Sequence, residues 1–147
     1  MFISPVMGYR NNVTPVNPAY RGKTPVSLSE VADLKVFYHH IYEFKKGIRN
    51  LILTTEKAKY KESISKRLMH ENIDFVIHDI AQEKINVYFG AKECVDVVKT
   101  FNPKLNELTP EQDFMLGIML GYDRVKQCER YMKIRRGDIK LGPNKAS

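Results

Sequence analysis

Residues 51–90 read LILTTEKAKYKESISKRLMHENIDFVIHDIAQEKINVYFG, and this stretch decides the fold. A short apolar run at 48–53 is followed by an amphipathic segment at 60–69, whose apolar residues recur with helical spacing. Two further apolar runs, 75–80 and 85–89, flank a polar turn and therefore indicate an antiparallel hairpin. The stretch predicts the order strand, helix, strand, strand.

A second helix is predicted after this unit, because valines at helical spacing lead from residue 95 to Phe101. The complete order βαββα belongs to the α+β class, with a small three-stranded sheet. It corresponds to most of a ferredoxin-like split βαβ unit that lacks its fourth strand. One edge of the sheet is therefore expected to be open.

An N-terminal helix is predicted to precede the sheet. Ser27 and Glu30 fit a capping box, in which the serine accepts from the third helical amide and the glutamate reaches back. Apolar residues then follow a helical stripe through residues 34–44, and Gly47 is a plausible end.

A long C-terminal helix is predicted to begin with Thr109 as N-cap, Pro110 at the first helical position and Gln112 closing a capping box. Residues 114–120 are apolar on all sides, which is typical of a helix covered on every side. A second subunit is the expected cover, so the sequence predicts a homodimer. The residues expected in that dimer helix are Phe114, Gly117, Ile118 and Gly121, with the two glycines allowing close approach.

The net charge of +7 is concentrated in the two ends of the chain. Residues 27–132 contain equal numbers of basic and acidic residues. We therefore predict one α+β domain at 27–134 between disordered basic tails at 1–26 and 135–147. A neutral domain argues against specific nucleic-acid binding, whereas basic tails attract acidic partners in general.

The chain shows neither a membrane-spanning run nor a secretory leader, so a cytoplasmic protein is expected. Its two cysteines, Cys94 and Cys128, are too few for a disulfide scaffold and are expected to be reduced. The motifs HExxH, GxGxxG, GxxxxGK[ST] and the serine elbow are all missing. No metal and no cofactor are predicted, and a non-enzymatic role is favoured.

Two polar clusters are the candidate binding residues. The first lies in the second half of the N-terminal helix and just after it, and the second follows Gly121: His39, His40, Tyr42, Glu43, Lys46 and Arg49, then Tyr122, Asp123, Arg124, Gln127 and Cys128. Both a salt-bridged surface and a binding patch remain open interpretations.

Cys128 is expected on the buried side of a continuous C-terminal helix, because it shares a face with Val125 and Met132. A buried thiol in apolar surroundings is inert. The alternative is a thiol-dependent enzyme that uses Cys128, with His40, Glu43 or Asp123 as auxiliary groups.

Three stretches carry a family likeness: HHIYEFKKGIRNLILTT at 39–55, INVYFG at 85–90 and LTPEQDFMLGIMLGYDRVKQCERY at 108–131. Together they resemble a small bacterial family classified as a domain of unknown function, number twenty twenty-three. The resemblance implies an α+β homodimer with three strands and supplies no activity, cofactor or catalytic residue. It also implies genes beside flavodoxin, which makes an acidic flavodoxin-type protein a candidate partner.

The leading hypothesis is a small non-enzymatic homodimeric interaction or regulatory module, associated with flavodoxin-type electron transfer. One alternative is the thiol enzyme described above. The other is a regulatory domain that binds a small ligand between the open sheet edge and the last helix.

Overall fold

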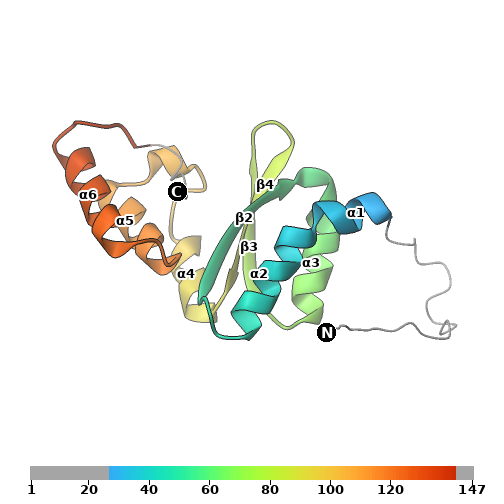
Figure 1. Cartoon of the computed structure of the whole chain (residues 1–147). Helices are drawn as coiled ribbons and strands as arrows, with labels where there is room; N and C mark the ends of the chain where they lie inside the picture. The colour runs from blue at the N-terminus through green and yellow to red at the C-terminus, as the bar shows by residue number, and fades with distance from the viewer. Residues whose placement is uncertain (1–26, 142–147) are drawn as a thin grey trace, which may run out of the picture. The chain divides into compact units, whose positions relative to one another are not determined.

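A computed structural model describes residues 27–141 of the chain (Figure 1). The chain divides into two units, one ending at Val31 and one beginning at Ala32. The predicted N-terminal tail at 1–26 lies outside the described residues, as do residues 142–147 of the predicted C-terminal tail.

The structure contains α-helices, two 3₁₀ turns and three strands between residues 27 and 141. In chain order they are α1 (Leu28–Asp33), α2 (Lys35–Lys45), β2 (Leu51–Lys57), a 3₁₀ turn (Ala58–Tyr60), α3 (Lys61–His70), β3 (Asp74–Ile80), β4 (Lys84–Gly90), α4 (Lys92–Lys99), a second 3₁₀ turn (Leu105–Glu107), α5 (Pro110–Met119) and α6 (Arg124–Arg135). None of the helices between residues 27 and 141 is long and apolar enough to cross a membrane.

The sheet has the strand order β2-β4-β3, and both pairings are antiparallel. Leu53 lies opposite Tyr88, and Tyr88 lies opposite Val76. The outer strands β2 and β3 therefore run parallel to each other on either side of β4. The predicted α+β class, the three strands and the order βαββα are confirmed.

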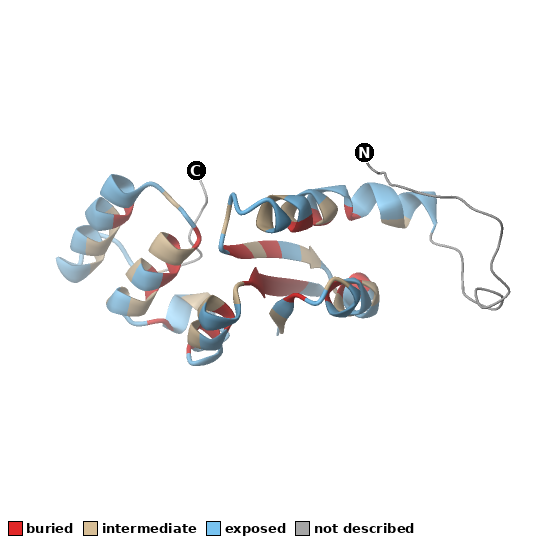
Figure 2. Cartoon of the chain, turned by 90° about the horizontal axis from the view of Figure 1, so that it is seen from below, coloured by how far each residue is buried: buried red, intermediate tan, exposed pale blue. Residues whose placement is uncertain are grey.

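Helices cover both faces of this sheet, and the alternation of side chains along β4 explains how (Figure 2). Ile85, Val87 and Phe89 pack with α2 and α3, whereas Tyr88 packs with α4 and α5. Consecutive residues of a strand point to opposite faces, so β4 contributes to two separate apolar clusters. α3 and α4 lie on opposite faces of the sheet. The predicted similarity to a ferredoxin-like unit therefore holds for the strand order but not for the position of α4.

The N-terminal helix differs from the prediction, because a turn at Leu34 divides it into α1 and α2. Its two ends agree with the sequence signals. The Oγ of Ser27 accepts a hydrogen bond from the amide of Glu30 at 3.0 Å. Gly47 has a φ of 76°, and the amide of Ile48 donates to the carbonyl of Glu43, the bond of a Schellman motif.

The prediction of one long C-terminal helix is wrong, because the chain forms two helices, α5 and α6. Gly121 adopts a φ of 83°, and the amide of Tyr122 donates to the carbonyl of Gly117. This is again a Schellman motif, which ends α5. Asp123 then caps α6, since its side chain accepts a hydrogen bond from the amide of Lys126 at 2.9 Å.

Gly117 is in close contact with a side chain of α6. A Cβ on Gly117 would lie 2.0 Å from the Oε1 of Gln127 on α6. Arg130 of α6 also donates two hydrogen bonds, of 2.9 and 3.1 Å, to the buried carboxylate of Asp113 on α5. The predicted close approach at Gly117 is therefore made by this chain's own α6, and Gly121 ends a helix instead of packing against another one.

Candidate functional site

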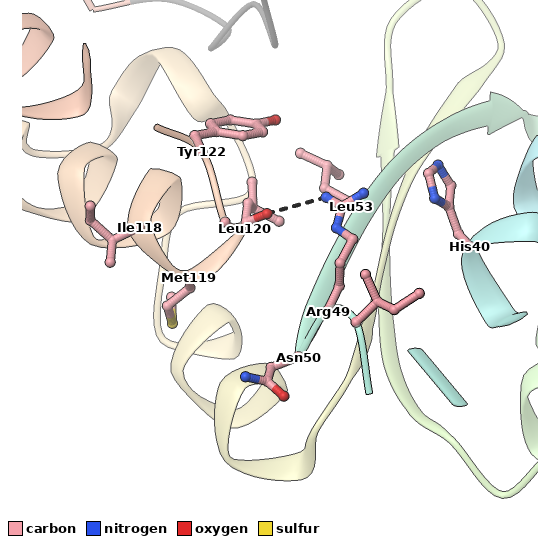
Figure 3. A pocket seen from close by; sticks show the side chains of 10 residues that line it. His40, Arg49, Asn50, Leu53, Ile118, Met119, Leu120 and Tyr122 are labelled. Carbon is pink, nitrogen blue, oxygen red and sulfur yellow. Dashed lines mark hydrogen bonds between the residues drawn. The ribbon is translucent and has the colours of Figure 1, made fainter. Parts of the chain in front are cut away.

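A cavity of about 570 Å³ lies beside β2 and brings the two predicted polar stretches together (Figure 3). Its lining comes from α2, from the loop that leads into β2, from β2 itself and from the end of α5: His40, Ile48, Arg49, Asn50, Leu53, Ile118, Met119, Leu120, Gly121 and Tyr122. The cavity thus lies between an edge strand and the end of α5, and its volume is typical of ligand sites.

Glu43 is the charged centre of the α2 side. Its Oε1 lies 2.7 Å from the Nδ1 of His40 and 3.8 Å from the Nη1 of Arg49. The hydrogen bond from His40 lowers the pKa of Glu43, and the nearby positive charge of Arg49 acts in the same direction, while burial opposes both. Glu43 therefore helps to orient the side chains of His40 and Arg49, both of which line the cavity.

Arg49 connects the two sides of the cavity. Its Nη2 donates a hydrogen bond of 3.2 Å to the backbone carbonyl of Leu120, at the end of α5. Figure 3 shows this bond passing beside Leu53. A guanidinium carries five N–H donors, so one bond to a carbonyl leaves most of its donor capacity available.

Tyr122 supplies the aromatic wall. Partial burial raises the pKa of its hydroxyl, although the charge of Arg49 counteracts the effect. Burial also raises the pKa of the neighbouring Tyr88 to about 12, with a smaller contribution from Tyr122. Both hydroxyls are therefore neutral near pH 7 and act as hydrogen-bonding groups.

The other predicted residues of α2 point elsewhere. His39 is exposed and stacks on Tyr42 with ring centroids 6.2 Å apart. The Nζ of Lys46 lies 5.6 Å from the centroid of the same tyrosine ring. His39, Tyr42 and Lys46 therefore form an aromatic and cationic cluster on the exposed side of α2, separate from the residues that line the cavity.

The second polar stretch is also divided. Tyr122 lines the cavity, Asp123 caps α6 and Arg124 is exposed. Gln127 is only 7% exposed, because its side chain lies over Gly117.

Cys128 is exposed, so the expectation of a buried thiol is wrong. The expectation assumed one continuous helix, and the break at Gly121 changes which face of the second half is buried. In α6 the buried residue is Gln127, with Arg130 and Ile134 partly buried at helical spacing after it. Cys128 instead lines an apolar groove of about 370 Å³ with Phe114, Met115 and Met132.

The thiol and its suggested auxiliaries are not brought together. His40 lines the cavity beside β2, whereas Cys128 lines the groove between α5 and α6. Asp123 accepts from its own helix terminus.

Sequence reasoning missed several residues around the cavity. Asn50 and Leu53 line it from the β2 side, and Ile118, Met119 and Leu120 line it from α5. Glu56, which does not line the cavity, was missed as well: its carboxylate accepts from Thr54 at 2.6 Å, and its half-burial raises its pKa. The detectable signal was a carboxylate on the face of β2 that carries the buried Ile52 and Thr54.

These features define an α+β protein whose three-stranded antiparallel sheet has helices on both faces and a cavity beside an edge strand. The chain belongs to the family described as protein of unknown function DUF2023, whose sequence pattern matches residues 35–134. The matched range contains the whole sheet, the cavity-lining residues and almost all of α6. No curated protein matches the chain.

Proposed function

We propose that this protein is a small non-enzymatic binding module whose recognition site is the cavity beside β2. The observation that carries the proposal is the convergence of Arg49, His40 and Tyr122 on one cavity, although the first two are more than 70 residues from the third. The cavity combines a fixed cation and an aromatic wall with the apolar side chains of Leu53 and Ile118. Ligand sites commonly combine such an apolar surface with a few placed polar groups.

The same geometry disfavours the thiol enzyme. A nucleophile and its base need to be within hydrogen-bonding reach of each other. Cys128 and His40 line different cavities, and the Nδ1 of His40 is already 2.7 Å from Glu43. A binding role requires neither a nucleophile nor a base.

The partner we propose is acidic, because Arg49 is cationic and none of the described residues that line the cavity carries a carboxylate. The resemblance adds a flavodoxin-type protein as the specific candidate, since its family places such genes nearby. Electrostatic attraction of this kind weakens as salt is added.

The test is a chemical-shift titration of the labelled full-length protein with the flavodoxin from the same cell at low salt. We expect saturable shifts at His40, Arg49 and Tyr122, and at least a tenfold weaker affinity for Arg49→Gln. Lys66→Gln is the control that removes one positive charge, because Lys66 is exposed, lies outside the basic tails and does not line the cavity. Absence of any shift would remove flavodoxin as the partner, and equal affinity of the two variants would remove the cavity as the site.

We further propose a homodimer, formed through the groove between α5 and α6. The groove lining is almost entirely apolar, and the exposed side chains of Met115, Val125 and Met132 lie on these two helices. Contiguous exposed apolar surface is typical of protein interfaces.

A further inference from the structure

Every second residue of β2 bonds to β4 through its backbone, and the residues between them direct their backbone groups away from the sheet. The hydrogen bonds at the two ends of β2 show which residues belong to which set. The carbonyl of Asn50 accepts from the amide of Ala91 at 2.8 Å, and the amide of Ala58 donates to the carbonyl of Glu83 at 2.8 Å. Both pairs continue the register between β2 and β4. Residues of an antiparallel strand alternate between bonding to the partner and pointing away from it. The even-numbered residues of β2 therefore bond to β4, and the odd-numbered residues direct their N–H and C=O groups outward.

Leu53 is one of the residues whose backbone groups point away from β4, and it also lines the cavity. β2 is an edge strand, and Leu53 is the β2 residue that lines the cavity. Among the residues that the structure describes, neither the amide nor the carbonyl of Leu53 has a hydrogen-bond partner, and the same holds for Thr55. An exposed edge of this kind is a template for an additional strand.

The side chains around this edge favour an added strand that carries negative charge. Arg49 and His40 line the cavity, and none of the residues at 27–141 that line it is an aspartate or glutamate. The Glu43 carboxylate lies next to both side chains, 3.8 Å from the Nη1 of Arg49, without itself lining the cavity. The Arg49 guanidinium, bonded to Leu120, retains unused N–H donors and lines the same cavity as Leu53. Charge-assisted bonds from arginine to a carboxylate are stronger than bonds to a neutral carbonyl. Ile118 and Met119 supply apolar contacts on the other side.

We propose that an extended acidic segment of a partner protein adds to the open edge of β2 as a fourth strand. Its backbone pairs with Leu53 and Thr55, and one of its carboxylates binds Arg49. Strand addition takes affinity from main-chain hydrogen bonds and specificity from alternate side chains. This inference rests on the proposed function and names the class of partner that the cavity receives.

The direct test measures amide hydrogen exchange in the full-length protein with a capped octapeptide of alternating valine and glutamate. In the protein alone, the amides of Leu53 and Thr55 exchange rapidly because they are unpaired. At near-saturating peptide, exchange at both positions slows by roughly tenfold, in proportion to the bound fraction. A peptide with lysine in place of glutamate gives no slowing. Unchanged exchange with the acidic peptide at millimolar concentration would overturn the proposal.

A pair of variants separates the backbone from the side chain. Leu53→Ala and Leu53→Pro both lose the leucine side chain, but only proline loses the outward N–H. Proline is tolerated on an edge strand where its missing N–H would face away from the sheet. We expect Leu53→Pro to bind the acidic peptide about tenfold more weakly than Leu53→Ala, because only the proline variant also loses the outward N–H. Equal binding by the two variants would contradict strand addition. If Leu53→Pro does not fold, strand addition is tested by the amide exchange of Thr55 in the natural protein. Exchange that the acidic peptide does not slow would then contradict strand addition.

The two proposals fail in different ways. Shifts at Arg49 and Tyr122 without slower exchange at Leu53 and Thr55 would overturn strand addition and leave a binding cavity. Absence of shifts at Arg49 and Tyr122 with either the flavodoxin or the acidic peptide would overturn the binding cavity itself.

Discussion

A side chain at Gly117 would displace the amide group of Gln127, which occupies the space where a Cβ would lie. This is a steric requirement and not a conformational one, since Gly117 lies within α5 and has ordinary helical backbone. At the scale of single residues, then, a glycine that looks like a dimer contact in the sequence is the place where two helices of one chain meet.

We expect Gly117→Ala to lower the free energy of unfolding by about 1–2 kcal/mol, since overpacking outweighs the gain of nearly 1 kcal/mol in helix propensity. Urea denaturation measures the change. In a Gln127→Ala background the added methyl group has space, so the same substitution becomes neutral or stabilising. An equal cost in both backgrounds would show that Gln127 is not the obstacle.

Glu43 gives the protein a pH-dependent contribution to stability. Because the pKa of Glu43 is lowered in the folded state, its stabilisation is present above its ordinary pKa of 4.5 and is lost as the pH falls through the folded value. We expect the difference in unfolding free energy between the natural protein and Glu43→Gln to shrink from about pH 5 to pH 3. Urea denaturation at each pH measures it, and a difference independent of pH would contradict this reading of the His40 contact.

At the scale of elements, the segment that connects α5 and α6 determines which residues of α6 are buried and which are exposed. Gly121 ends α5 and Asp123 begins α6 within three residues. This short connection turns the chain so that Gln127 packs over Gly117 and Cys128 faces outward. Exposure also means that rapid alkylation of Cys128 would not by itself indicate catalysis.

Asp123 is expected to act on stability as a helix cap. Replacing it with alanine removes the acceptor for the Lys126 amide and should cost about 1 kcal/mol, whereas asparagine keeps an acceptor and should cost much less. Thermal and urea denaturation of the two variants measure the difference. Equal losses for Asp123→Ala and Asp123→Asn would indicate a role for the negative charge instead of the cap.

At the scale of the whole molecule, the groove between α5 and α6 is the surface on which the homodimer proposal depends. Met132 is 48% exposed at this groove, and Cys128 lies one turn before it. A glutamate at position 132 would place a charge against apolar surface, which is costly without a partner.

Sedimentation equilibrium should therefore find a dimer for the natural chain at tens of micromolar and a monomer for Met132→Glu. Lys133→Glu serves as the control, because Lys133 is exposed and does not line the groove. A monomer for the natural chain at 100 micromolar would exclude the dimer, and dissociation of both variants alike would indicate a charge effect unrelated to the groove.

Much of the fold was predictable because its determinants are local. The alternation at 85–89 identified a strand, the spacing at 60–69 identified a helix, and Thr109 and Pro110 identified the start of α5. Capping bonds and side-chain periodicity act over only a few residues. Gly121 was misinterpreted because a glycine four residues after another one suits both a packing face and a helix end. Its φ of 83° and the open space around it identify the helix end, and both are known only from the structure.

The sequence by itself determined the α+β class, the strand order along the chain and the two groups of polar residues, since each depends on neighbours within a few residues. Only the tertiary structure decided that His40 and Arg49 share a cavity with Tyr122, while Cys128 lies in a different groove. The bond from Arg49 to Leu120 joins residues 71 positions apart. Such a contact depends on how β2 and α5 pack on the same sheet face, and that packing is set by the whole apolar core and not by local sequence.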